Sequence, residues 1–226
     1  MPIKDFERGR KKSNMIEFNL VGSTWTPVTE TWYIYDGMTV IEERSNKKIP
    51  AVHYTRVLDL SGSSGGAGGI GGLLTRSSGY NSSTGAWFTH DYYHADGSGN
   101  ITMLISNSTT PTIRAQYEYD PFGRIQTQSG SLATANTQRF SSKEQIGTSP
   151  LSYYGYRFYH AEAQRWMNWD PFEEDGGLNL YGFVHNSPID DWDLLGLQGG
   201  GNGPYCGKRR CHYGLFVVVI NIVIKD

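Results

Sequence analysis

The sequence predicts an all-β fold built from antiparallel β-hairpins, and three observations support this prediction. The 226 residues include 6 Trp, 15 Tyr and 9 Phe, which favour strands and must supply much of the core as rings. The 28 Gly and 9 Pro mark frequent turns. Helical periodicity is nearly absent, and its best candidate, residues 161–167, has flanking residues that suggest a turn at most.

Composition and charge exclude several classes of protein. The formal net charge of −2 removes the electrostatic case for binding nucleic acid or an anionic membrane. The longest apolar run, residues 215–224, is much shorter than the roughly 20 residues that a helical membrane span needs. The N-terminus carries no apolar stretch typical of a secretory signal peptide. We therefore expect no nucleic-acid partner and no membrane span.

The two cysteines, Cys206 and Cys211, lie close together near the C-terminus and cannot cross-link the rest of the chain. With His212 they offer three potential metal ligands, and the chain has no second cysteine pair to complete a zinc site. We expect neither a metal nor another cofactor. A small disulfide loop and two free thiols are both compatible with this spacing.

Residues 1–15 form a basic leading segment in which Arg8, Arg10, Lys11 and Lys12 cluster. A solvated segment is a simpler interpretation of this cluster than an arm that binds nucleic acid.

Residues 16–135 are predicted to form a series of β-hairpins. Strand-like runs flank turns at Asp36-Gly37, Asp96-Gly97 and Asp120-Pro121. In such turns Asp accepts a backbone N–H, Pro fixes φ, and Gly tolerates a left-handed conformation. Because a single hairpin cannot bury its own face, we expect the hairpins to join in a continuous sheet.

A Gly-rich segment, residues 61–72, interrupts this series and contains the pattern G-x-G-x-x-G at Gly66, Gly68 and Gly71. A dinucleotide-binding loop needs a helix directly after this pattern. Residues 73–79 are too short and too rich in Ser and Gly for that helix. A conformationally demanding loop within the β structure is therefore favoured over a nucleotide site.

Two aspartates toward the C-terminus, Asp170 and Asp193, are candidates for chemistry. Asp170 directly precedes Pro171 and Asp193 lies near Gly196, so each is first interpreted as opening a turn. The alternative is that the fold brings the two carboxylates together to share one proton, so that one acts as acid and the other as base. The pattern alone leaves both interpretations open.

Seven aromatic residues lie close together before and around these aspartates, too densely to be left in water without a partner surface. They are Tyr153, Tyr154, Tyr156, Phe158, Tyr159, Trp166 and Trp169. We expect most of them to be buried against the sheet.

Five blocks in the second half of the chain occur in the order and spacing of a known family. They are Tyr119-Asp-Pro-Phe-Gly-Arg124, Arg139-Phe-Ser-Ser-Lys143, Tyr153-Tyr-Gly-Tyr-Arg-Phe-Tyr159, Gly177-Leu-Asn-Leu-Tyr-Gly-Phe-Val-His-Asn-Ser-Pro188 and Asp193-Leu-Leu-Gly-Leu197. Together they resemble the RHS repeat-associated core, the C-terminal end of YD-repeat shells that is shared by Tc-toxin C components and, more distantly, by teneurins. Arg165-Trp and Asp170-Pro lie between the third and fourth blocks in the same order, and the upstream Tyr35-Asp-Gly, Leu58-Asp-Leu-Ser-Gly and Gly66-Ala-Gly-Gly-Ile-Gly-Gly-Leu-Leu74 resemble the segment before this core. With them the resemblance covers residues 16–197, and the core is placed at residues 136–197.

The resemblance implies β-hairpins wound into a hollow shell, with the core segment as a plug. Such shells enclose a variable C-terminal polypeptide, often a toxin, and release it by aspartyl-type autoproteolysis. The family's arginine matches Arg157 and its two aspartates match Asp170 and Asp193, with cleavage between Leu197 and Gln198. One departure is that Leu194 stands where the family has a turn-fixing Pro.

The resemblance also bears on the whole chain. Members that enclose a cargo are far longer, so we expect this chain to be the terminal piece of a shell, secreted or at a cell surface as the family is. Residues 198–226 are interpreted as a Gly-rich linker and a short variable tip. Their uncharged run, residues 215–224, is either part of that tip or a strand that completes the shell.

The expected function is thus a structural shell fragment that encloses and presents a variable C-terminal polypeptide. Its expected partners are the rest of a YD-repeat shell or its own C-terminal tip. If the chain is an enzyme, it is at most a self-cleaving aspartyl-type autoprotease. The alternative is a cell-surface adhesion or carbohydrate-binding module without catalysis.

Overall fold

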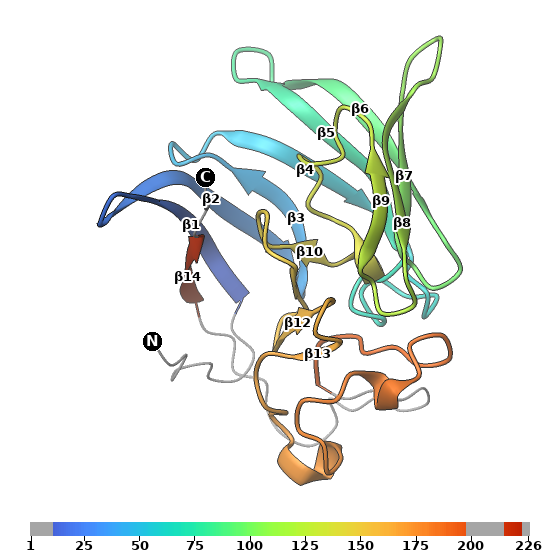
Figure 1. Ribbon diagram of the computed structural model, residues 1–226. Helices are drawn as coiled ribbons and strands as arrows, with labels where there is room; N and C mark the ends of the chain where they lie inside the picture. Colours follow the sequence, from blue (N-terminus) through green and yellow to red (C-terminus); the bar gives the residue numbers. More distant parts are fainter. Residues whose placement is uncertain (1–10, 198–214, 223–226) are drawn as a thin grey trace.

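The computed structural model describes residues 11–197 and 215–222, and their regular secondary structure is almost entirely β-strand (Figure 1). The larger sheet contains β1 (Lys11–Val21), β2 (Thr24–Asp36), β3 (Thr39–Arg44), β4 (Pro50–Arg56), β5 (Leu73–Asn81), β6 (Ala86–Ala95), β7 (Ile101–Ser106), β8 (Ile113–Tyr119) and β9 (Ile125–Ser129), with β14 (Leu215–Ile222) beside β1. The smaller sheet contains β10 (Glu144–Gln145), β11 (Leu151–Tyr153), β12 (Phe158–His160) and β13 (Arg165–Trp166). Three 3-10 turns, η1 (Phe140–Ser142), η2 (Glu173–Gly176) and η3 (Val184–Asn186), complete the described elements.

The hairpin prediction is confirmed, because β1 to β9 pair with their neighbours in chain order and antiparallel throughout. Asp36-Gly37 joins β2 to β3, and Asp96-Gly97 lies between β6 and β7. In the turn between β8 and β9, the Oδ1 of Asp120 accepts the backbone N–H groups of Phe122 (3.0 Å) and Arg124 (2.9 Å). This turn chemistry is local, and the sequence is therefore enough to specify it.

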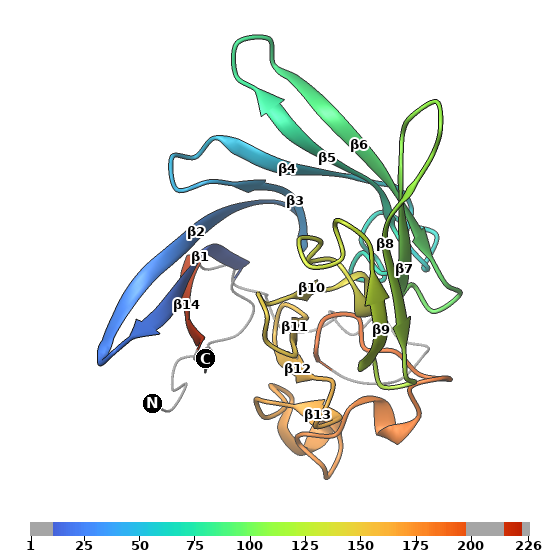
Figure 2. The ribbon, with the colours of Figure 1, turned by 45° about the horizontal axis from the view of Figure 1, so that its top comes forward.

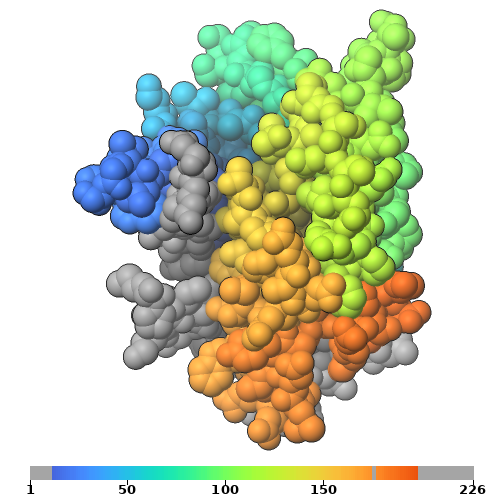
Figure 3. Space-filling model, in the orientation of Figure 1, coloured from blue at the N-terminus to red at the C-terminus, as the bar shows by residue number. Residues whose placement is uncertain are grey.

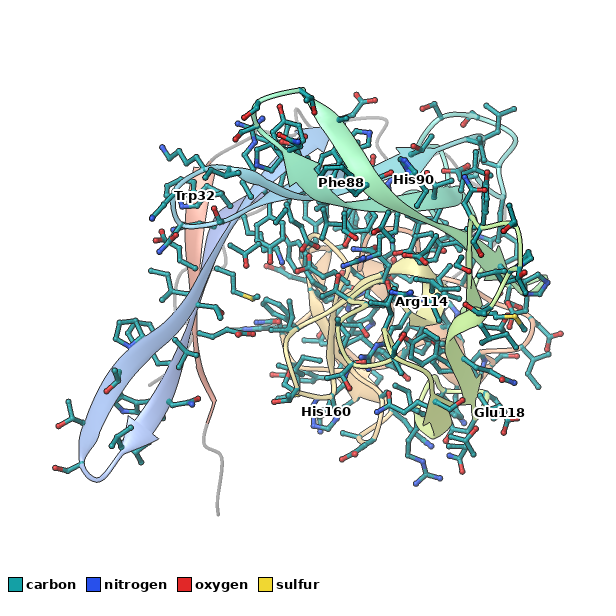
Figure 4. The ribbon with its side chains drawn as sticks, turned by 90° about the horizontal axis from the view of Figure 1, so that it is seen from above. Trp32, Phe88, His90, Arg114, Glu118 and His160 are labelled. Carbon is teal, nitrogen blue, oxygen red and sulfur yellow. The ribbon has the colours of Figure 1, made fainter. Side chains whose placement is uncertain are left out.

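The larger sheet curves into an open arc, and β10, β11 and β12 lie on its concave side (Figure 2). Seen from above, the strands bend around a dense set of side chains (Figure 4). The core is formed by residues of both sheets and of the segments between them: Met15, Tyr33, Val40, Val52, Tyr54, Leu73, Ile101, Leu104, Ala115, Tyr117, Ala133, Ile146, Tyr153 and Phe158. In the space-filling view, the yellow and orange segment after β9 lies directly beside the green strands (Figure 3).

Buried and exposed side chains alternate along the strands of the larger sheet, and the buried ones mark the face that packs against the core. In β8, Ala115 and Tyr117 are buried while Glu118 is exposed. In β6, Asp91 is buried and Phe88, labelled in Figure 4, is exposed. Because successive side chains of a strand point to opposite faces, each hairpin offers one face to the concave side and the other to solvent.

The Gly-rich segment, residues 61–72, is a loop between β4 and β5. A strand and not a helix follows it, so the nucleotide-binding interpretation is wrong and the loop interpretation is confirmed. Residues 161–164 form a turn before β13, as the sequence indicates.

The expectation of a solvated leading segment is wrong for Lys12. This residue lies in β1 and is fully buried, where its Nζ pairs with Glu144 Oε1 and lies 3.8 Å from the centroid of the Tyr33 ring. Burying an ammonium group is unfavourable without such a partner. The ion pair therefore ties the first strand of the arc to the first strand of the smaller sheet.

We expect Tyr33→Phe to lower the free energy of unfolding by about 1–3 kcal/mol, because the buried Glu144 carboxylate loses a hydrogen bond and keeps its ion pair with Lys12. The Tyr33 hydroxyl donates to Glu144 Oε1 over 2.9 Å, at the same carboxylate that pairs with Lys12. The matched control is Tyr92→Phe, since Tyr92 is 44 % exposed. Chemical denaturation checks both variants, and equal midpoints for the two would show that the hydrogen bond is unimportant.

The C-terminal strand β14 lies at the edge of the larger sheet and pairs with β1 in parallel, the exception to the antiparallel rule. Whether residues 215–224 belong to a variable tip or to a strand that completes the shell stays a prediction. Cys206, Cys211 and His212 lie outside the described residues. Within residues 11–197 and 215–222, no helix is long and apolar enough to cross a membrane.

Candidate active site

The side chain of Arg157 brings the two aspartates together. Arg157 lies in the tight turn between β11 and β12, and its guanidinium bonds to Asp170 Oδ2 through Nη1 (2.9 Å) and to Asp193 Oδ2 through Nη2 (3.2 Å). All three residues are buried, at 1 %, 8 % and 2 % exposure respectively. The planar fork of the guanidinium suits this double ion pair.

Both aspartates also form turns, as the first interpretation of the sequence expects, whereas the sharing of one proton between their carboxylates stays a prediction. Asp170 Oδ1 accepts the N–H of Phe172 over 2.8 Å. Asp193 Oδ1 accepts three successive backbone N–H groups, those of Leu195 (3.1 Å), Gly196 (2.6 Å) and Leu197 (3.0 Å). Asp193 therefore fixes the segment that ends at Leu197, while Leu194 in the place of Pro leaves the turn formed.

The carbonyl groups of this segment are held as well. Arg157 Nε donates to the Gly196 oxygen (2.6 Å) and the Tyr156 N–H donates to the Leu195 oxygen (3.1 Å). The approach is close, because a Cβ on Gly196 would lie 3.0 Å from the Arg157 nitrogen. Gln198, and with it the Leu197–Gln198 bond, lies outside the described residues.

Lys143 is a site residue that the sequence does not reveal. Its Nζ donates to the carbonyl oxygens of Leu194 (2.7 Å) and Gly68 (2.8 Å). Lys143 appears in one of the family-like blocks, but a lysine beside Glu144 in a polar stretch reads as exposed. Only tertiary contacts bury it.

Burial dominates the electrostatics of the site. It raises the pKa of both Asp170 and Asp193, while Arg157 and the backbone N–H groups act in the opposite direction. Burial likewise lowers the pKa of Arg157 and lowers that of Lys143 to about 7. Desolvation is thus the first cause of the raised carboxyl pKa values, and the sharing of a proton between the two aspartates stays a prediction.

Below the guanidinium lies a cluster of aromatic rings. The Arg157 Cζ is 4.3 Å from the centroid of the Trp166 ring. The cluster consists of the rings of Phe140, Tyr154, Tyr159, Trp166 and Phe183, together with the aliphatic side chain of Val184. Six of the seven predicted aromatics are buried, and Trp169 is the exception at 70 % exposure. The guanidinium of Arg157 is therefore packed against a buried apolar cluster.

No model of a protein family matches the chain. Toxin subunit YenC2 of Yersinia entomophaga is 41 % identical over 83 residues, which is 35 % of this chain and 8 % of that protein. Toxin subunit YenC1 of the same organism is 37 % identical over 94 residues, 40 % of this chain and 10 % of that protein. The double-stranded DNA deaminase toxin A of Burkholderia cenocepacia (strain H111) is 29 % identical over 93 residues, 39 % of this chain and 6 % of that protein.

Among solved structures, the TcdB2-TccC3-TEV protein matches with a TM-score of 0.61 at 22 % identity, over 84 % of this chain and 8 % of that one. The TcdB2-TccC3-Cdc42 structure matches with a TM-score of 0.55 at 24 % identity, over 75 % of this chain and 8 % of that one. At this identity the structures establish a shared fold. The chain spans a tenth or less of the length of the toxin subunits it matches.

Proposed function

We propose that the chain is one piece of a β shell of the RHS repeat-associated type and that it cleaves its own chain after Leu197, and its similarity to toxin subunits YenC2 and YenC1 supports the first part of the proposal. The observation that carries the proposal is the buried Arg157 with Asp170 and Asp193, where Asp193 also holds the N–H of Leu197. The structural role rests on the curved sheet and its relatives, and the cleavage rests on this site.

The proposed reaction needs no group from outside the chain except water. One carboxylate takes a proton from the water, whose oxygen attacks the carbonyl carbon of Leu197. The protonated partner gives its proton to the nitrogen of Gln198 as the C–N bond breaks. The products are a carboxylate at Leu197 and an amine at Gln198.

The environments of the two aspartates suggest how the roles are divided. Asp193 accepts three N–H groups and an Arg157 contact, which favour its ionised form. Asp170 accepts one N–H besides its Arg157 contact and is the more exposed of the two. We assign Asp170 as the group that exchanges its proton with solvent and Asp193 as its ionised partner.

The shell role implies partners of two kinds. The first kind is the neighbouring part of a longer RHS shell, because the arc of the larger sheet is open (Figure 2). The residues beyond Leu197 are the second, as the polypeptide that the shell would present. Adhesion and carbohydrate binding receive no support from the comparisons, whose relatives are toxins and toxin subunits.

We expect the intact mass of the purified chain to reveal two products, residues 1–197 and 198–226. The measurement is made on chain synthesised with inhibitors of serine, cysteine and metalloproteases, so that contaminating enzymes are excluded. A folded chain that retains its full-length mass would overturn the cleavage and leave a passive shell piece.

A further inference from the structure

The Gly-rich loop, residues 61–72, meets the segment that would be cleaved. The side chain of Lys143 bridges the two backbones, because its Nζ donates to the carbonyl oxygens of Gly68 (2.8 Å) and Leu194 (2.7 Å). Neither the proposed chemistry nor the shell architecture requires this loop to reach the site.

The loop is fixed from two sides. Asp59 is buried, and its Oδ2 accepts the N–H groups of Ala67 (2.8 Å) and Gly69 (3.1 Å). The N–H of Gly71 donates to Ser142 Oγ over 3.0 Å, which ties the loop to η1, directly before Lys143. The backbone of the loop is therefore held in one conformation by hydrogen bonds on both sides.

Gly68 is the point at which a side chain would collide with the segment. A Cβ there would lie 2.2 Å from the Leu194 oxygen and 2.9 Å from Lys143 Nζ, and the φ of Gly68 is +59°. Gly65, in the same loop, has a φ of +81° but no atom within 4 Å of an added Cβ. The two glycines share the left-handed conformation and differ in the contact.

We propose that Gly68 and Lys143 form a clamp that positions the segment 194–197 for self-cleavage, an inference that rests on the proposed function. Lys143, Tyr156 and Arg157 hold the carbonyl oxygens of three successive residues, Leu194, Leu195 and Gly196. The carbonyl of Leu197 is then the next one along the chain. Displacing a reacting bond by as little as 1 Å can lower the rate about 100-fold. Contacts that position the residues next to the bond therefore affect the rate of cleavage strongly.

Lys143 also adds charge to the site. The groups that face it are Arg56 from β4, Asp59 before the loop, Asp193, and the Tyr154 ring with its centroid at 5.3 Å. Asp193 favours the charged form of Lys143, and by reciprocity the Lys143 charge favours ionised Asp193. With its pKa near 7, Lys143 loses this charge as the pH rises through neutrality.

The first test compares Gly68→Ala with Gly65→Ala in the full chain. The measurement is the rate at which the 1–197 fragment appears after cell-free synthesis. We expect Gly68→Ala to slow cleavage about 100-fold. Gly65→Ala carries the same backbone strain without the collision and should cleave at close to the wild-type rate. Equal rates for the two variants would overturn the clamp.

The second test compares Lys143→Met with Lys143→Arg, and uses the exposed Lys47→Met as control. We expect Lys143→Met to slow cleavage and to move the acidic limb of the rate–pH profile to higher pH, because Asp193 loses a favourable charge. Lys143→Arg should return the limb toward its wild-type position. If the acidic limb of the rate–pH profile did not shift in Lys143→Met, the electrostatic role of Lys143 would be wrong. If the cleavage rate of Lys143→Met were unchanged, the positioning role proposed for the clamp would be wrong as well.

A third measurement separates the clamp from the cleavage. If the wild-type chain stays whole, hydrogen exchange of the Leu195, Gly196 and Leu197 amides still reports on the segment. We expect exchange about tenfold faster in Gly68→Ala and Lys143→Met than in Gly65→Ala, as the loss of one hydrogen bond would give. Unchanged exchange would overturn the clamp, whereas absent cleavage alone overturns the proposed function.

Discussion

Asp170→Asn and Asp193→Asn should each abolish cleavage after Leu197, with rates at least about 10²–10⁴-fold lower than wild type. An amide cannot take a proton from water or pass one to the Gln198 nitrogen at neutral pH. Intact mass after synthesis checks the result, and only the full-length chain is expected. Asp190→Asn is the matched control, because Asp190 is exposed in the same stretch of chain and should leave cleavage unchanged.

The two Asn variants are expected to remain folded. Since burial raises the pKa of both carboxyls above their unfolded values, ionising them opposes folding. That part of the stability is present below the unfolded-state pKa of about 3.9 and is lost as the pH rises through the folded value. An uncharged amide avoids this loss, and its oxygen can still accept the backbone N–H groups. Continued cutting at Leu197 by either variant would exclude the aspartate pair.

Much of the fold follows from local sequence. The turns at Asp36-Gly37 and Asp120-Pro121 need only a side-chain acceptor and a permissive backbone, so each hairpin can be located before any contact is known. The order of the sheet then follows, because consecutive hairpins pair with their neighbours. The curvature of the arc and the position of β10 to β13 on its concave side depend on packing between distant residues, which no local pattern encodes.

The same distinction applies to the candidate site. Its three charged residues can be named from the family-like blocks, but Arg157 and Asp193 are 36 residues apart and only the fold joins them. Lys143 and Lys12 read as solvated cations, and both are buried by contacts with segments far away in sequence. The Gly-rich loop predicts a demanding conformation, whereas its contact with Leu194 becomes visible only in three dimensions.

Trp166→Ala should lower the free energy of unfolding by about 3–5 kcal/mol, the range for removing a fully buried large aromatic side chain. Trp166 has no exposed surface. Its ring meets Tyr154 edge-on, with centroids 5.1 Å apart, and Phe183 at 5.4 Å. Such contacts add to the area that the ring buries, and the cavity left by alanine would lie directly below Arg157. Guanidinium denaturation followed by circular dichroism measures the change.

Trp169→Ala is the matched control, because it removes an exposed tryptophan from the same stretch of chain. Trp169 lies three residues further along but is 70 % exposed, so its removal should change the free energy of unfolding by no more than about 0.5 kcal/mol. Trp166→Phe keeps a ring in the cluster and is expected to fall between the two. If Trp166→Ala and Trp169→Ala had the same denaturation midpoint, the aromatic cluster would not be the support on which Arg157 and its two aspartates are positioned.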